Sequence, residues 1–343
     1  MSSVSVSTQV GVFVTNQHPT GVDLVAAQRE QLGLVAAARD YGWDSVWAGQ
    51  HYLPDEMSML QPVPFLGRLM ADAEGMRVGL GILLIALQNP VHVAETFASL
   101  DVLCEGRFTL GVGLGYRDVE YEAFGLTRSE GVHRLEKNLR LVQELWKGDP
   151  VTVDLPWCRL NGAQLGVLPA QKPRPPIWMA ANADRAVARA AKLADAWMIN
   201  PHATMSTIAR QLTLYRTVRD EAALPPPSEL PLIREIFCAS DPSAQQDARS
   251  YLANKYRVYA GWGQDRVMPE SEDFSAPIDD LSADRFIIGS PDECLERLLP
   301  WQQQLGVNHI IFRTHWSGMP AEVSLGSMKL LSEEIVPALK EAP

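Results

Sequence analysis

Two short apolar runs joined by one amphipathic segment constrain this chain most strongly. Residues 78–85 and 108–112 have the pattern of buried β-strands, and the apolar side chains between them recur at helical spacing. Asn89 and Pro90 open the intervening segment, as an N-cap followed by a first-turn proline does in a helix. Such a series indicates a parallel β-α-β unit, in which both strands end on the same face. Folds of this kind place their active sites on that face.

Strands and helices alternate along the rest of the chain. The hydrophobic pattern predicts eight strands, at residues 10–14, 45–48, 78–85, 108–112, 177–180, 196–199, 232–238 and 309–312. Eight strands that are each followed by a helix are typical of an α/β fold of the (β/α)8 TIM-barrel type. A doubly wound sheet is the alternative, but it would need eight consecutive right-handed crossovers without an extra domain.

The length favours one domain. A barrel of roughly 250 residues with insertions accounts for residues 1–343 as a single unit. Two stretches interrupt the alternation: residues 151–170 are irregular and compatible with a small hairpin, and residues 261–283 are polar and glycine-bearing. Long connections in a compact domain usually act as lids or binding segments, so we expect both inserts near the carboxyl-terminal mouth of the barrel.

Composition limits the partners of the chain. With 41 acidic and 30 basic residues the net charge is -11, which argues against nucleic acid and anionic membranes. The longest apolar run, residues 82–87, is far shorter than the ~20 residues of a membrane span. The amino terminus shows no signal-peptide pattern, and the four cysteines form no C-x-x-C pair. We therefore expect a cytoplasmic protein with reduced cysteines.

The segment S-V-W-A-G-Q-H-Y places Gln50 and His51 directly after the second predicted strand. At that point a side chain leaves the packed core and faces the barrel mouth. His51 is therefore a candidate general acid or base, a hydrogen-bond donor to substrate, or a gate residue. The structural alternative is a histidine that only bonds a backbone carbonyl.

A glycine-rich turn, G-V-G-L-G-Y, follows the fourth predicted strand. Its glycines, Gly113 among them, allow the backbone to approach a flat ligand, or only allow a turn with positive φ. The pattern lacks the G-x-G-x-x-G spacing of a nucleotide-binding helix. Arg117 stands beside the turn and could meet a phosphate, although an ion pair with Asp118 or Glu120 explains it equally well.

Small residues separate the fifth predicted strand from the helix that follows. They leave the backbone N–H groups of Ala181, Asn182 and Ala183 unobstructed, and the helix dipole favours an anion there. Asn182 is the expected phosphate contact, provided that the carboxylate of Asp184 points away.

Other chemistries find little support in the sequence. The seven histidines show no H-E-x-x-H or H-x-H spacing, so we expect no metal site. A set gathered from separate strands, His51, His202 and His309, is the residual option for a metal. The chain also lacks the G-x-S-x-G of serine hydrolases and the G-x-x-x-x-G-K-[ST] of P-loop enzymes.

Taken in order, these segments resemble the bacterial-luciferase-like flavin-dependent oxidoreductases over nearly the whole chain. The matching segments are S-V-W-A-G-Q-H-Y, V-G-L-G-I-L-L-I-A-L-Q-N-P, L-D-V-L-C-E-G-R-F-T-L-G-V-G-L-G-Y with E-Y-E-A-F-G, P-P-I-W-M-A-A-N and G-V-N-H-I-I-F-R. The resemblance implies a TIM barrel that binds reduced FMN, or the deazaflavin F420, at the carboxyl-terminal mouth of its strands. It also favours a homodimer.

The resemblance assigns cofactor contacts to particular residues. Gly81 and Ile82 fall where the family often has a non-proline cis peptide, which forms a bulge against the isoalloxazine ring. Ala181, Asn182 and Ala183 fall at the turn that holds the cofactor phosphate.

Two positions depart from the pattern of the luciferases. Gln50 and His51 fall where luciferases carry a pair of histidines, so both are candidate catalytic residues and the resemblance favours His51. Leu114 replaces an arginine of the turn after the fourth strand. Arg117 is then the substitute for a cofactor contact, and the case for light emission is weaker.

The resemblance implies a monooxygenase. Such enzymes receive reduced FMN from a separate flavin reductase, react it with O2 to a peroxyflavin, and oxygenate a small organic substrate. The alternative is an F420-dependent oxidoreductase, which exchanges a hydride with its substrate. A remoter alternative is a flavin-binding protein without catalysis, which the changes at Gln50 and Leu114 motivate.

Overall fold

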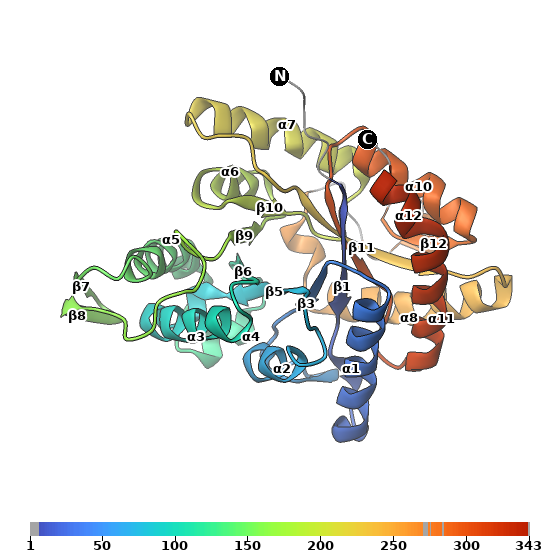
Figure 1. Ribbon diagram of the computed structural model, residues 1–343, viewed down its shortest axis with the longest axis horizontal. Coiled ribbons are helices and arrows are strands. Elements are labelled where there is room, and N and C mark those ends of the chain that lie inside the picture. Colours follow the sequence, from blue (N-terminus) through green and yellow to red (C-terminus); the bar gives the residue numbers. More distant parts are fainter. Residues whose placement is uncertain (1–6, 270–273, 275, 283–284, 342–343) are drawn as a thin grey trace.

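A curled parallel β-sheet forms the centre of the molecule (Figure 1). The computed structural model describes residues 7–269, 274, 276–282 and 285–341. Within these residues the sheet has 9 strands, which pair in the order β10-β9-β6-β5-β3-β1-β13-β11-β12. Their bounds are β1 (Gln9–Val14), β3 (Ser45–Ala48), β5 (Arg77–Leu84), β6 (Phe108–Gly113), β9 (Ile177–Ala180), β10 (Ala196–Met198), β11 (Pro231–Cys238), β12 (Ile287–Gly289) and β13 (His309–Arg313).

Helices surround this sheet (Figure 1). They are α1 (Leu24–Asp40), α2 (Pro62–Leu69), α3 (Pro90–Leu103), α4 (Asp118–Ala123), α5 (Arg128–Leu145), α6 (Asp184–Leu193), α7 (Met205–Glu221), α8 (Pro242–Gly261), α9 (Ile278–Ser282), α10 (Pro291–Gln303), α11 (Ala321–Leu330) and α12 (Val336–Glu341). The predicted start of α3 is confirmed, because the Asn89 side chain accepts hydrogen bonds from the N–H groups of Val91 and His92. None of the described helices combines the length and apolar character that a bilayer crossing requires.

The predicted strands are all present, with each end within one residue of its expected position. The number of strands is wrong by one, because β12 was not predicted. This strand has three residues, too few to show a hydrophobic period, and it pairs with the carboxyl-terminal part of β11 through Ile236 and Ile287. A short strand of this kind is visible only once its partner is in place.

A backbone bridge joins β10, at one end of the strand order, to β11 near the other end. Ile199 pairs in parallel with Leu232. The N–H of Ile199 donates to the carbonyl of Pro231 at 2.9 Å, and the N–H of Ile233 donates to the carbonyl of Ile199 at 3.0 Å. The sheet therefore curls far enough to bring these two strands within hydrogen-bonding distance.

Two small antiparallel strand pairs lie outside the main sheet. β2 (Gln17–Pro19) pairs antiparallel with β4 (Met57–Met59). The small hairpin expected within residues 151–170 is confirmed: β7 (Val151–Leu155) pairs antiparallel with β8 (Cys158–Ala163). It projects at the periphery beside α5 (Figure 1).

A compact apolar cluster fills the inside of the curl. It contains strand residues only: Phe13, Trp47, Trp178, Ala196, Met198, Ile233 and Ile311. The rings of Trp47 and Trp178 stack with their centroids 4.6 Å apart. Gly79 makes room for this pair, because a Cβ at that position would lie 2.1 Å from Cε3 of Trp47.

Replacing Gly79 by alanine should therefore destabilise the fold. The added methyl group must displace a buried indole, and overpacking of this kind costs about 1–3 kcal/mol in the free energy of unfolding. Gly33→Ala is the matched control, because nothing lies within 4 Å of a Cβ there and an exposed mid-helix glycine gains about 0.5–1 kcal/mol on change to alanine. Urea unfolding of both variants measures the difference, and equal midpoints would contradict the account of the Trp47 contact.

Candidate functional site

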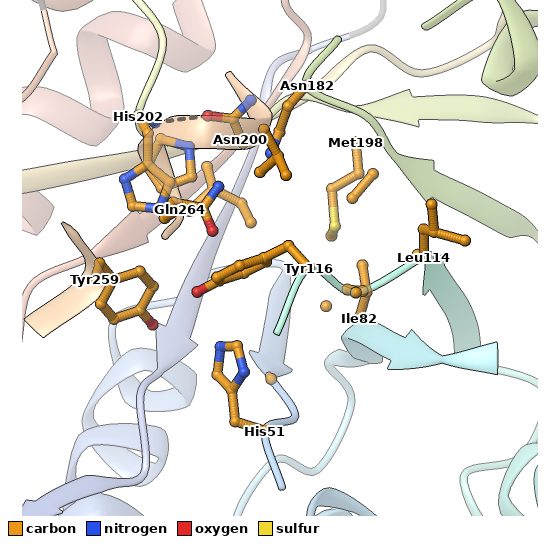
Figure 2. Close-up of a pocket in the computed structure, with 18 of the residues that line it drawn as sticks. His51, Ile82, Leu114, Tyr116, Asn182, Met198, Asn200, His202, Tyr259 and Gln264 are labelled. Carbon is orange, nitrogen blue, oxygen red and sulfur yellow. Dashed lines mark hydrogen bonds between the residues drawn. The ribbon is translucent and has the colours of Figure 1, made fainter. Parts of the chain in front are cut away.

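A cavity of about 410 Å³ opens at the carboxyl ends of the parallel strands. Residues in or directly after β1, β3, β5, β6, β9, β10, β11 and β13 line it, together with residues that follow α8. Figure 2 shows polar side chains of Asn200, His202 and Gln264 on one side of this cavity and Met198, Leu114 and Ile82 on the other. The predicted location of the site, beyond the strand ends, therefore coincides with the described cavity.

His51 lines the cavity and is held by a buried carboxylate. Oε1 of Glu120 accepts hydrogen bonds from Nδ1 of His51 at 3.1 Å and from the N–H of Tyr52 at 2.9 Å. Glu120 is fully buried at the start of α4. Because a carboxylate only accepts hydrogen bonds, this contact assigns a proton to Nδ1, and in the neutral tautomer that has this proton Nε2 carries the lone pair. The sequence had offered Glu120 only as an ion-pair partner of Arg117.

Gln50 also lines the cavity, but its amide bonds the protein itself. Oε1 accepts from the N–H of Leu84 at 3.0 Å, and Nε2 donates to Tyr52 and Gln61. The acceptor bond pins the end of β5 to the loop that carries His51. These contacts give Gln50 a positioning role in the structure, and its catalytic role stays a prediction.

The peptide bond between Gly81 and Ile82 is cis, as the resemblance implied. Both residues line the cavity, and the register of β5 against β6 shifts between Leu80 and Leu83. Gly113 of β6 accommodates this bulge, because a Cβ there would lie 2.2 Å from Cδ1 of Ile82. The lack of a side chain at Gly113 therefore leaves the space that Ile82 occupies. The sequence did not reveal this role of Gly113.

Arg117 lies outside the set of described residues that line the cavity. Its guanidinium donates to the carbonyls of Tyr52 and Leu53 at 2.7 and 3.1 Å, and it stacks on the ring of Trp262 at 4.3 Å. The side chain thus supports the loop after His51 and ties it to the segment after α8. Its Nη1 also lies 3.8 Å from Oε1 of Glu120, which is one of the two ion pairs that the sequence offered as the alternative. A contact of Arg117 with a cofactor stays a prediction.

Ala181, Asn182 and Ala183 line the cavity at the turn between β9 and α6. The first turn of α6 has no side-chain cap, so its N–H groups are available to an anion. The carboxylate of Asp184 points to Arg210, which it meets at 2.7 and 2.9 Å. The hydrogen bonds from Arg210 and Gln211 lower the pKa of Asp184. The carboxylate of Asp184 therefore points away from the turn, as a phosphate contact at Asn182 requires.

Sequence reasoning missed Thr15, Tyr116 and Asn200 in the wall, and it named His202 only as part of a residual metal set. The side-chain atoms Oγ1 of Thr15, OH of Tyr116, Nδ2 of Asn200 and Nδ1 of His202 are buried and have no hydrogen-bond partner among the described residues. Burial, followed by the neighbouring Tyr259 and Glu120, raises the pKa of Tyr116. Asn200 and His202 follow β10 as His51 follows β3, so the same rule of strand ends could have found them.

The three histidines of the residual metal option do not converge. His309 is the first residue of β13, at the amino end of the sheet, where its Nε2 lies 2.7 Å from Oγ of Ser45. His51 and His202 line the cavity at the opposite end. Among the described residues, no group of three or more His, Cys, Asp or Glu side chains is arranged to hold a metal ion.

The two inserts differ in their relation to the cavity. None of residues 151–170 lines it, so the first insert does not contribute to the cavity wall. Gln264, Arg266, Val267 and Met268 of the second insert do line it. Residues 270–273, 275 and 283 of that insert lie outside the described part of the chain.

Removing the carboxylate of Glu120 should cost about 1–3 kcal/mol of the free energy of unfolding, since two partly buried N–H donors lose their acceptor. Glu120→Ala tests this, and Glu122→Ala is the control because Glu122 is exposed on the same helix. Urea unfolding monitors both variants. Equal unfolding midpoints would show that Glu120 does not hold the loop of His51.

Several known proteins are similar to this chain in sequence and in fold. The family described as Luciferase-like monooxygenase matches residues 8–309. The F420-dependent glucose-6-phosphate dehydrogenase of Nakamurella multipartita is 28% identical over 92% of this chain and 95% of that protein. The 4-hydroxyprotoasukamycin monooxygenase of Streptomyces nodosus subsp. asukaensis is 29% identical over 46% of this chain and 43% of that protein.

A solved structure gives the same result for the fold. Monooxygenase RslO1 from Streptomyces bottropensis superposes with a TM-score of 0.79 at 23% identity, over 96% of this chain and 99% of that one. The family match covers residues 8–309 and thus far more than half of the sequence. This chain therefore belongs to the luciferase-like monooxygenase family, whose members include FMN-dependent monooxygenases and F420-dependent oxidoreductases.

Proposed function

We propose that this chain is an FMN-dependent monooxygenase that uses reduced FMN and O2 to oxygenate a small organic substrate. The observation that carries the proposal is the meeting of three features in one cavity: the Gly81–Ile82 bulge, the uncapped start of α6 and the pair of His51 with Glu120. Reduced FMN, when bound, would supply the electrons that activate O2. We assign catalysis to His51 and a positioning role to Gln50.

The residues of the cavity fit a flat ring with an anionic tail. A Cβ on Gly81 would lie 3.1 Å from Cε2 of Phe13 and 3.2 Å from Cε of Met198, so the glycine keeps a close apolar approach open. Asn182 and the N–H groups of α6 would hold the phosphate. The unpaired polar atoms of Thr15, Tyr116 and Asn200 are available to the polar edge of the ring or to substrate.

His51 can move a proton at Nε2. The Glu120 carboxylate orients the ring through Nδ1 and stabilises the imidazolium that forms when Nε2 takes a proton. The aromatic rings of Trp262, Tyr116 and Tyr259 surround His51, with centroids 5.0, 5.9 and 6.0 Å from its own. These rings cover most of the imidazole, whose side chain is 13% exposed, and so limit the access of water to the proton-transfer site.

Several assembly features belong to the same proposal. We propose that the curled sheet acts as a closed (β/α)8 barrel with β12 added, which the bridge between Ile199 and Leu232 supports. We also propose that residues 1–343 form one domain, that the protein is a cytoplasmic homodimer, and that a separate flavin reductase supplies reduced FMN. Family membership supports these statements.

A second candidate is an F420-dependent oxidoreductase that transfers a hydride. The extent of the likeness favours it: the F420-dependent relative matches 92% of this chain, whereas the monooxygenase relative matches 46%. The His51–Glu120 pair would serve that reaction equally well, because an alcohol loses a proton as it gives up a hydride.

The two candidates make opposite predictions about O2. We expect the purified protein to bind reduced FMN and to couple O2 uptake to oxygenation of a substrate from a panel of aldehydes, ketones and aromatic compounds. Reduced F420, which activates O2 poorly, serves as the comparison cofactor. Turnover with F420 in the absence of O2 would replace the first proposal by the second. FMN binding without turnover on the whole panel would favour the flavin-binding protein that lacks catalysis.

His51→Ala should lower kcat on the order of 100-fold or more, as the loss of a general acid or base does. The Kd for FMN should stay within about threefold, because the imidazole acts in proton transfer and not in cofactor binding. His133→Ala is the control, since His133 is exposed on α5 away from the cavity. Steady-state kinetics and FMN fluorescence quenching give the two readouts, and an equal loss in both would refute the chemical role of His51.

A further inference from the structure

The wall of the cavity carries positive charge in an acidic protein. Its described residues include Arg128, Arg266 and Arg313 but no Asp or Glu, although the net charge of the chain is -11. A cleft lined by one sign of charge concentrates ligands of the opposite sign. The cavity therefore favours anionic ligands over neutral or cationic ones.

Arg313 is the arginine whose charge is least screened. Arg128 and Arg266 are exposed, and Arg128 faces Asp118 at 3.6 Å. Arg313, at the end of β13, is only 5% exposed. Electrostatic interactions of a buried guanidinium are much stronger than those of a solvated one.

The partners of Arg313 leave part of its hydrogen-bonding capacity unused. Nη2 donates to Oε1 of Gln17 at 3.1 Å, Nη1 lies 3.5 Å from Oε1 of Glu235, and Nε has no partner among the described residues. Glu235 is itself shared, because Lys255 and Trp316 also bond its carboxylate. One buried carboxylate thus faces two buried basic side chains, Arg313 and Lys255.

The positive charges near the cavity also act on His202, in the same wall, although burial is the larger effect. Its pKa is lowered by burial first and then by the positive charges of Lys255, Arg313, Arg234 and Arg285. Burial and the Arg313 guanidinium likewise lower the pKa of Lys255. A positive potential lowers the pKa of a basic group, as is seen for both residues, and a bound anion would raise these pKa values again.

Asn200 presents a second donor to the cavity. Its Oδ1 accepts from the N–H groups of His202 and Ala203 at 2.8 and 3.2 Å, which fixes the orientation of the amide. Nδ2 is therefore the group that is left for a ligand, and it is buried and has no partner among the described residues. Asn200 lies beside His202 on the polar side of the cavity (Figure 2).

We propose that the substrate of this enzyme carries a carboxylate, which binds in a subsite formed by Arg313 and Asn200. The planar guanidinium suits a carboxylate, and an anion is the partner that the buried positive charge lacks. We assign the cofactor phosphate to a different turn, the one between β9 and α6. The inference rests on the proposed function for its setting, with the reacting end of the substrate at His51.

Matched pairs of probes test the subsite. Acetate and acetamide, benzoate and benzamide, and phenylacetate and phenylacetamide differ in charge but little in shape. Calorimetric titration of the full-length protein, with and without FMN, gives their Kd values. We expect at least one carboxylate to bind about tenfold or more tightly than its amide. Failure to bind FMN would count against the proposed function alone, because the preference for carboxylate is measured in both states.

Arg313→Met should reduce that preference to about one, and Arg313→Lys should retain part of it. The methionine variant leaves Glu235 paired with Lys255, so the remaining carboxylate keeps a buried partner. Arg257→Met removes the same charge from an exposed ion pair with Glu56 and should keep the full preference. The proposal is overturned if no carboxylate binds better than its amide, or if Arg313→Met keeps the preference. It is also overturned if Arg313→Met weakens only the binding of reduced FMN, since Arg313 would then serve the cofactor ring.

Discussion

Parallel strand pairing is the constraint on which the rest of this structure depends. Parallel strands all run in one direction, so their carboxyl ends meet at one edge of the curled sheet. His51 follows β3, Tyr116 follows β6, Asn200 follows β10, and Arg313 ends β13. These residues lie far apart in sequence and line one cavity only because the strands that carry them are in parallel register.

A second set of side chains keeps this edge in shape. The side chain of Gln50 forms a hydrogen bond with the backbone of Leu84, and that of Arg117 with the backbone of Tyr52 and Leu53. Glu120 joins the imidazole of His51 to the backbone of its own loop. Polar residues near a site therefore divide into those that face a ligand and those that hold the former in place.

The sequence allowed prediction of the strands and of the cavity position of His51, because each depends on local pattern. The cis peptide at Gly81–Ile82 was expected only from the resemblance to the luciferase-like family. β12 escaped prediction, because its existence depends on a partner strand and not on its own residues. The position of Arg117 escaped for a related reason. The guanidinium of Arg117 is held by the ring of Trp262 and by the carbonyls after His51, and these partners are distant from Arg117 in sequence.

The bond between Asp184 and Arg210 has a consequence for how two helices cooperate. Asp184 stands at the amino end of α6, where a negative charge would compete with any phosphate. Arg210 belongs to α7 and holds that carboxylate aside. The charge that a ligand meets at α6 is thus set by the placement of a neighbouring helix. The electrostatic selectivity at the start of α6 thus depends on helix packing. A shift of α7 relative to α6 would alter this selectivity without any change in the residues at the turn.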